Sequence, residues 1–201
     1  FSSALDIGCG SGILSFMLAQ HHPDAMILGV DISNHAIELA LRNKAAIPFA
    51  ANVSFIHKHF NDLNNDLIPL DLIICNPPYF KSSLLPVNLE RQRQRHATNF
   101  NFDSFATFCN RHLVKDGCVC MVIPYHYETE LSFRMSLEGL YLLDLVIVKH
   151  TDSSEPSLCL CRYVLRQGKL NKTNLILFKD DNTLTPAFRD LTYPFLNFNK
   201  E

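Results

Sequence analysis

Two short stretches contain side chains that could do chemistry, and each follows an apolar run. In "ALDIGCGSGILS", Asp6 precedes three alternating glycines, Gly8, Gly10 and Gly12. In "LDLIICNPPYF", an asparagine, two prolines and a tyrosine follow residues 70–75. Glycines let a backbone approach a ligand closely, whereas an amide and an aromatic ring can orient and stack a planar group. The sequence therefore combines a ligand-binding turn with a motif suited to a planar amino compound.

The glycine turn predicts a site for S-adenosylmethionine. The dinucleotide pattern G-x-G-x-x-G fails, because Ile13 stands where its third glycine belongs. Asp6 would repel a pyrophosphate but suits a cationic ligand. Asp31 ends the next apolar run, in "GVDIS", where a carboxylate can bind ribose hydroxyls. A carboxylate beside the turn, three glycines and a second carboxylate together indicate this cofactor rather than an ordinary tight turn.

The motif Asn76, Pro77, Pro78 and Tyr79 predicts transfer to an exocyclic amino group. Such a nitrogen is a poor nucleophile until hydrogen-bond acceptors orient it, and the Asn76 side-chain oxygen and the Pro77 carbonyl can be those acceptors. The two prolines stiffen the backbone. Tyr79 offers a ring on which a base taken out of its stack can lie. Because a sulfonium methyl is already activated, the reaction requires alignment rather than a strongly perturbed base.

Composition limits the classes of partner. The chain of 201 residues is long enough for one domain with its own core, and its formal net charge of -2 shows no overall basic excess. A polyanion must therefore be bound by a local patch. Lys81, Arg91, Arg93, Arg95 and His96 follow the N-P-P-Y motif and are expected to contact RNA phosphates. The alternative is a solvated surface turn.

Cysteines and histidines do not indicate a metal site. The seven cysteines include no C-x-x-C, and several lie in apolar runs, which indicates reduced, buried thiols in a cytoplasmic protein. His21 and His22 end a predicted helix, and His57 and His59 alternate along a strand, where they need only face solvent. The sequence shows neither a membrane span nor a signal peptide. We therefore expect no metal, no membrane and no obligate protein partner.

Strand-like and helix-like segments alternate along most of the chain, which favours βαβ units and a mostly parallel sheet. The helices are predicted at 12–22, 34–46, 103–114 and 127–138. The strands are predicted at 4–8, 25–32, 53–58, 70–75, 118–124, 141–149, 158–166 and 174–179. The last three strands are joined by short turns, so an antiparallel edge is expected there. Segments 80–101 and 151–157 are predicted loops.

With both motifs in place, the chain resembles the class I, Rossmann-like S-adenosylmethionine-dependent methyltransferases. Closer features resemble the tRNA1(Val) adenine-37 N6-methyltransferase family. They are "NPPYF", "RQRQRHATNFNFDSF", "GCVCMVIP" and "LTPAFRDLTYPF". The resemblance implies a single domain over 1–201, with a three-layer α/β/α fold and a mostly parallel seven-stranded sheet that has an antiparallel edge near the C-terminus. The family also has an N-terminal segment beside the cofactor, and we expect one to precede Phe1.

The resemblance implies a cytoplasmic enzyme that methylates the N6 atom of an adenine in tRNA, adenine 37 of a valine tRNA. Asp6 and the three glycines would form the cofactor turn, and Asp31 would hold the ribose. Asn61 or Asp62 would lie near the cofactor adenine, and Asn76 would contact both cofactor and target. Three alternatives remain: a protein glutamine N5-methyltransferase acting on release factors, a DNA adenine methyltransferase, and a binding module without activity.

Overall fold

The computed structural model describes residues 1–63, 67–77, 100–193 and 195. Its strands are β1 (Ser3–Ile7), β2 (Met26–Asp31), β3 (Val53–His57), β4 (Leu70–Cys75), β5 (Leu113–Pro124), β6 (Tyr141–Lys149), β7 (Pro156–Val164) and β8 (Asn171–Ile176). Its α-helices are α1 (Ile13–His21), α2 (Asn34–Ala45), α4 (Phe102–His112), α5 (Glu128–Leu137) and α6 (Pro186–Thr192). Two short 3₁₀ helices are η1 (Phe60–Asp62) and η2 (Tyr125–Tyr127).

The strands form one continuous sheet in the order β3-β2-β1-β4-β5-β7-β6-β8. The first five strands in this order run parallel, and β7 runs antiparallel to both of its neighbours. The mostly parallel α/β fold is confirmed. The eight strand segments predicted from the sequence are all present, and only the count of seven implied by the resemblance was wrong, because β8 pairs in parallel with β6. The antiparallel pairing expected near the C-terminus is confirmed, because β7 lies between β5 and β6 and runs opposite to both.

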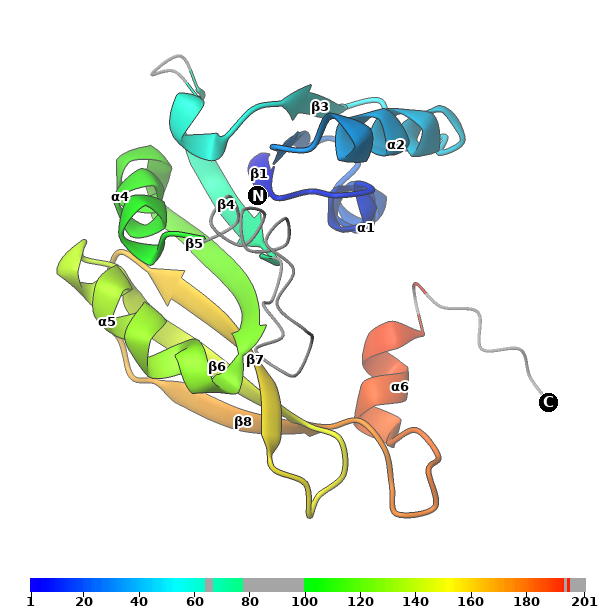
Figure 1. Ribbon diagram of the computed structural model, residues 1–201, viewed down its shortest axis with the longest axis vertical. Coiled ribbons are helices and arrows are strands. Elements are labelled where there is room, and N and C mark those ends of the chain that lie inside the picture. Colours follow the sequence, from blue (N-terminus) through cyan, green and yellow to red (C-terminus); the bar gives the residue numbers. More distant parts are fainter. Residues whose placement is uncertain (64–66, 78–99, 194, 196–201) are drawn as a thin grey trace, which may run out of the picture.

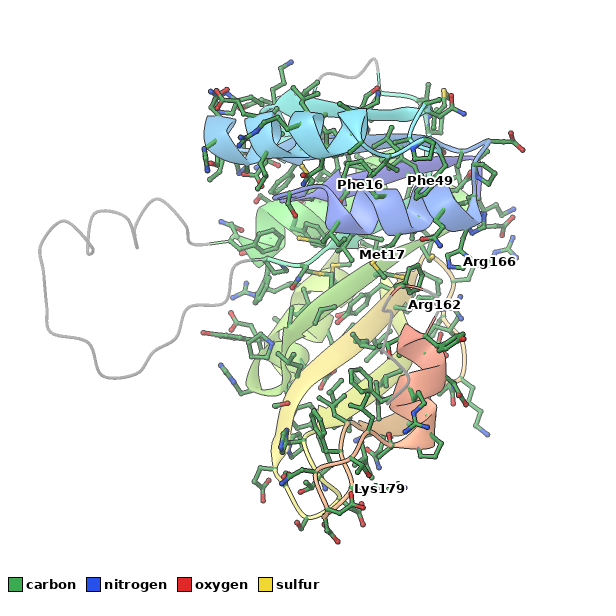
Figure 2. The ribbon with its side chains drawn as sticks, turned by 90° about the vertical axis from the view of Figure 1, so that its right-hand side faces the viewer. Phe16, Met17, Phe49, Arg162, Arg166 and Lys179 are labelled. Atoms are coloured by element: carbon green, nitrogen blue, oxygen red, sulfur yellow. The ribbon has the colours of Figure 1, made fainter. Side chains whose placement is uncertain are left out.

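Helices cover both faces of the sheet, as expected for three layers. One core cluster joins Phe16 of α1 and Ile37 of α2 to β1, β2 and β3. The other joins Phe105 of α4 and Leu131 of α5 to β4, β5, β6 and β7. In Figure 1, α4 and α5 lie together, away from α1 and α2. In Figure 2, Phe16 lies on the side of α1 toward α2, and Met17 lies on the opposite side.

The positions of buried residues explain the strands. β1 is buried at all five of its residues, as a central parallel strand must be. In the segment 117–123 of β5, fully buried side chains alternate with half-buried ones, which gives one face to the α4 and α5 core. Phe105 and Phe108 are buried, and Phe100 and Phe102 pack against the same core, so this phenylalanine cluster serves core packing.

Several elements differ from the sequence prediction. β5 begins at Leu113 rather than at 118. α6 was missed, although Thr185 accepts a hydrogen bond from the Phe188 N–H and Pro186 is the first helical residue, a recognisable start signal. All seven cysteines are free, five of them buried, and Cys118 and Cys120 half-buried. Among the described residues, no helix is long and apolar enough to cross a membrane.

Candidate functional site

The glycine turn connects β1 to α1 at the carboxyl end of the sheet. Gly8, Gly10 and Gly12 have φ values of 72°, 55° and 83°, which residues with a side chain rarely adopt. The N–H groups of Gly8 and Cys9 both donate to the Val30 carbonyl, at 2.8 and 3.0 Å. The turn is therefore fastened to the end of β2.

Asp31 makes the second attachment between the turn and β2. Its Oδ2 accepts a hydrogen bond from the Gly10 N–H at 2.9 Å, and its Oδ1 accepts one from the Ser33 N–H at 2.8 Å. A carboxylate oxygen can accept two hydrogen bonds, so each oxygen has capacity for a further donor. Asp31 is half-buried at the strand end. This arrangement suits the vicinal hydroxyls of a ribose.

Asp6 is a buried carboxylate directly beneath the turn. Its Oδ2 accepts a hydrogen bond from the Ser15 hydroxyl at 2.6 Å, whereas its Oδ1 is buried with no hydrogen-bond partner. Burial raises the pKa of Asp6 from 3.8 to about 6, the Ser15 hydrogen bond opposes this shift, and the charge of Asp31 adds to it. A buried oxygen without a partner costs free energy unless a ligand donates to it. Asp6 is thus prepared for a cationic donor.

Two of the three glycines, Gly8 and Gly10, have open space beside them in which a ligand could lie. A Cβ placed on Gly8 or Gly10 would meet nothing within 4 Å. A Cβ on Gly12 would lie 2.7 Å from Phe55 Cζ and 2.9 Å from Phe16 Cε2. Gly12 is therefore required for packing between α1 and β3. The open space at the first two glycines, with the Asp6 and Asp31 oxygens, fits the cofactor predicted from the sequence.

Asn76 and Pro77 follow β4 at the same edge of the sheet. Cys75 pairs with Ile7 of β1, so Asn76 and Gly8 are the next residues of two adjacent parallel strands. Asn76 is exposed and Pro77 is buried. The exposed Asn76 amide therefore lies beside the glycine turn, where a cofactor and a second ligand could both reach it. Seven other predicted site residues lie outside the described residues: Pro78, Tyr79, Lys81, Arg91, Arg93, Arg95 and His96.

The short helix η1 positions Asn61 and Asp62 after β3. His59 precedes it, and its Nδ1 accepts a hydrogen bond from the Asn61 N–H at 3.2 Å. The His59 ring stacks on Phe60, with centroids 4.5 Å apart, and Phe60 is buried in the α4 core. Asn61 and Asp62 are both exposed. The geometry leaves open which of the two would face a cofactor adenine.

His57 was expected only to face solvent, and it is exposed, but it also makes a specific contact. Its Nε2 lies 2.9 Å from the Ile32 carbonyl oxygen. Sequence reasoning missed this contact because the two residues are 25 positions apart and no local pattern links them. His57 thereby joins the carboxyl end of β3 to the segment that carries Asp31.

The thiols beside the site are not nucleophiles at neutral pH. Burial, with the charges of Asp6 and Asp31, raises the pKa of Cys9 to about 12. Burial also raises the pKa of Cys75 well above its ordinary value. A thiol must lose its proton to attack or to bind a metal. In the part of the chain that the structure describes, no three His, Cys, Asp or Glu side chains gather as a metal-binding group.

Known sequences that are similar to this chain are methyltransferases. The model of a methyltransferase-domain family matches residues 2–139. A tRNA1(Val) (adenine(37)-N6)-methyltransferase from Yersinia enterocolitica is 29% identical over 198 residues, which cover 96% of this chain and 78% of that protein. The protein of the same name from Aeromonas hydrophila is 29% identical over 192 residues, covering 95% and 80% of the two chains.

Solved structures show the same fold. A predicted O-methyltransferase from Agrobacterium tumefaciens superposes with a TM-score of 0.77 at 15% identity, over 100% of this chain and 92% of that one. The 16S rRNA (adenine(1408)-N(1))-methyltransferase from Catenulisporales acidiphilia has a TM-score of 0.58 at 16% identity, over 84% of this chain and 86% of that one. These identities are low, so the two structures establish the fold alone.

Proposed function

The chain belongs to the methyltransferase-domain family, and we propose that it transfers the methyl group of S-adenosylmethionine to N6 of an adenine in tRNA, adenine 37 of a valine tRNA. We also propose that residues 1–201 form one such domain and that it acts in the cytoplasm. The observation that carries this proposal is the arrangement of Asp31, the glycine turn and Asn76 at adjacent strand ends. The names of the two relatives supply the tRNA and the position.

The cofactor supplies a methyl group on a positively charged sulfur, and the described residues hold it. Asp31 accepts hydrogen bonds from the ribose hydroxyls, because each of its two oxygens accepts one backbone N–H and can accept a second donor. Asp6 Oδ1 accepts from the cationic amino-acid part, directly or through water. Asn61 or Asp62 borders the adenine. Gly8 and Gly10 provide the open backbone against which the ligand lies.

Asn76 and the residues after it hold the target base. The Asn76 side-chain oxygen and the Pro77 carbonyl accept the two hydrogens of the adenine amino group, so its lone pair points at the methyl carbon. Pro78 and Tyr79 lie outside the described residues, and the sequence predicts that they stiffen the backbone and stack on the base, respectively. This alignment is the catalytic contribution, because a sulfonium methyl is already activated and its transfer needs no strongly perturbed base. Lys81, Arg91, Arg93, Arg95 and His96 bind phosphates without reading sequence.

The first experiment identifies the methylated nucleoside. The full chain is incubated with S-adenosylmethionine and bulk tRNA from a strain that lacks this activity, and the digested nucleosides are analysed by mass spectrometry. N6-methyladenosine should form and should fall about a hundredfold or more in Asn76→Ala, because misplacing the amine is costly. Asn174→Ala, which changes an exposed asparagine of β8, is the matched control and should keep full activity. If cofactor binds but no methyladenosine forms, the glutamine methyltransferase alternative replaces the proposal, and release factors are the next substrate.

A second experiment tests the phosphate contacts. Replacing Arg91, Arg93 and Arg95 by glutamine should weaken tRNA binding and lower the slope of log affinity against log salt by about two to three, since each lost phosphate contact removes about 0.7 to 0.9. Cofactor affinity, measured by calorimetry, should stay unchanged. An unaltered salt slope would show that these arginines form a solvated surface turn.

A further inference from the structure

Three groups linked by hydrogen bonds hold the segment between β2 and α2. They are the His57 imidazole, the Ile32–Ser33 peptide unit and the Asp31 carboxylate. His57 is the last residue of β3 and pairs in register with Asp31. Its imidazole reaches one residue further and contacts the Ile32 carbonyl at 2.9 Å. A carbonyl oxygen only accepts hydrogen bonds, so the His57 Nε2–H is the donor, in the neutral ring and in the charged ring alike.

The Ile32 carbonyl and the Ser33 N–H belong to one peptide unit. That N–H donates to Asp31 Oδ1 at 2.8 Å. A peptide unit is planar and rigid, so fixing its oxygen also fixes the direction of its N–H. His57 therefore acts on the Asp31 carboxylate through a single rigid group.

Packing contributes little to the orientation of this peptide unit. Ile32 is 53% exposed, and Ser33 is exposed as well. The neighbouring backbone bond, from the Lys58 N–H to the Asp31 carbonyl at 3.0 Å, holds the preceding peptide unit instead. Ser33 is also the N-cap of α2, and its hydroxyl and carbonyl accept the Ala36 and Ile37 N–H groups, which hold the following peptide unit. On the Ile32–Ser33 peptide unit itself, the imidazole is the contact at the oxygen that directs the Ser33 N–H.

We propose that His57 is a positioning residue for cofactor binding, because it aims the Ser33 N–H and so fixes the Asp31 carboxylate that receives the ribose hydroxyls. This inference rests on the proposed binding of S-adenosylmethionine by this chain. His57 touches neither the cofactor nor the substrate in this role, and it requires only a donor at the Nε2 position.

The test compares His57→Leu, which removes the donor, with His57→Gln, which keeps an N–H of similar reach. Affinity for S-adenosylhomocysteine is measured by calorimetry on the full chain. The dissociation constant should rise about threefold to tenfold in His57→Leu, the usual value of one hydrogen bond, and should return most of the way in His57→Gln. His150→Leu, which removes an imidazole beside Phe178 at the distant end of the sheet order, is the control.

A second measurement separates positioning from a general structural effect. Gly10 and Ser33 both donate their N–H to Asp31, so their amide protons report the carboxylate directly. Their hydrogen exchange, followed by NMR in the free protein, should accelerate in His57→Leu and recover in His57→Gln. The Asn61 amide, which donates to His59, should exchange at the wild-type rate.

Each result decides the matter. An unchanged dissociation constant in His57→Leu, or a weakened affinity with unchanged Gly10 and Ser33 exchange, overturns the positioning role. The positioning role is also overturned if His57→Gln binds S-adenosylhomocysteine as weakly as His57→Leu does. If the wild-type chain does not bind S-adenosylhomocysteine, the proposed function itself is refuted. If wild type binds it and the dissociation constant is the same in His57→Leu, only the positioning role is refuted.

Discussion

Replacing Asp6 by asparagine should change the dependence of stability on pH. The pKa of Asp6 is 3.8 in the unfolded chain and about 6 in the folded protein, chiefly because burial disfavours the charge. Between these values the folded protein binds the proton more tightly than the unfolded chain does. Stability therefore falls as pH rises from about 4 to about 6. A shift of roughly two units corresponds to about 3 kcal/mol.

The assay is urea unfolding of the full chain, followed by circular dichroism from pH 4 to pH 8. Without ligand, wild type should lose up to about 3 kcal/mol relative to Asp6→Asn across this range, and the loss should be complete by pH 7. Asp24→Asn, which alters an exposed carboxyl in the turn before β2, is the matched control. A difference between wild type and Asp6→Asn that does not vary with pH would refute the burial argument.

Ligand affinity should respond to pH in the opposite direction. A cationic cofactor favours the ionised carboxylate, and only about a tenth of Asp6 is ionised at pH 5 if its pKa is about 6. The affinity for S-adenosylmethionine should therefore rise about tenfold between pH 5 and pH 7.5 in wild type, and far less in Asp6→Asn. Calorimetry at the two pH values measures this difference.

Three further substitutions test packing and hydrogen bonding by urea unfolding. Gly29→Ala should cost about 1 to 3 kcal/mol, because the new Cβ would lie 2.5 Å from Phe55 Cδ1, and Phe55→Leu should recover part of the loss. Asp71→Ala should cost about 1 kcal/mol, since its Oδ2 accepts the Ser2 N–H and hydroxyl, both at 2.7 Å. The lowered pKa of Asp71 means that this contribution disappears in acid. Tyr163→Phe should also cost about 1 kcal/mol, because the buried hydroxyl lies 3.0 Å from the Ser132 hydroxyl. Wild-type midpoints in any of the three would contradict the contact concerned.

The arrangement of strands could be predicted from the sequence because apolar runs and glycines are local signals. The run 70–75 agrees with β4 at both ends, and the three glycines all adopt the positive φ that their spacing suggests. Asp31 was identified as a strand-end carboxylate, and it does lie against the turn. These features depend on a few consecutive residues, so the pattern contains the information.

Other features depend on residues far apart in the chain. The eighth strand joins the sheet through pairing with β6, which no local pattern specifies. The contact from His57 to Ile32 and the partnerless Oδ1 of Asp6 arise only once three strands are side by side. The packing role of Gly12 likewise requires Phe55 from β3. Spacing alone does not distinguish close packing from close ligand approach, so the cofactor contact at this glycine stays a prediction.

The sheet order also bears on how the chain is made. Asp6 of β1 pairs with Ile74 of β4, and 67 residues separate them in the chain. At about 5 to 20 residues per second, roughly 3 to 13 s pass during synthesis before the second partner of β1 exists. During that interval one edge of a strand that is fully buried in the folded protein has no native neighbour and can pair with other chains. The strand that supports the glycine turn is therefore open to wrong pairing until β4 has been made.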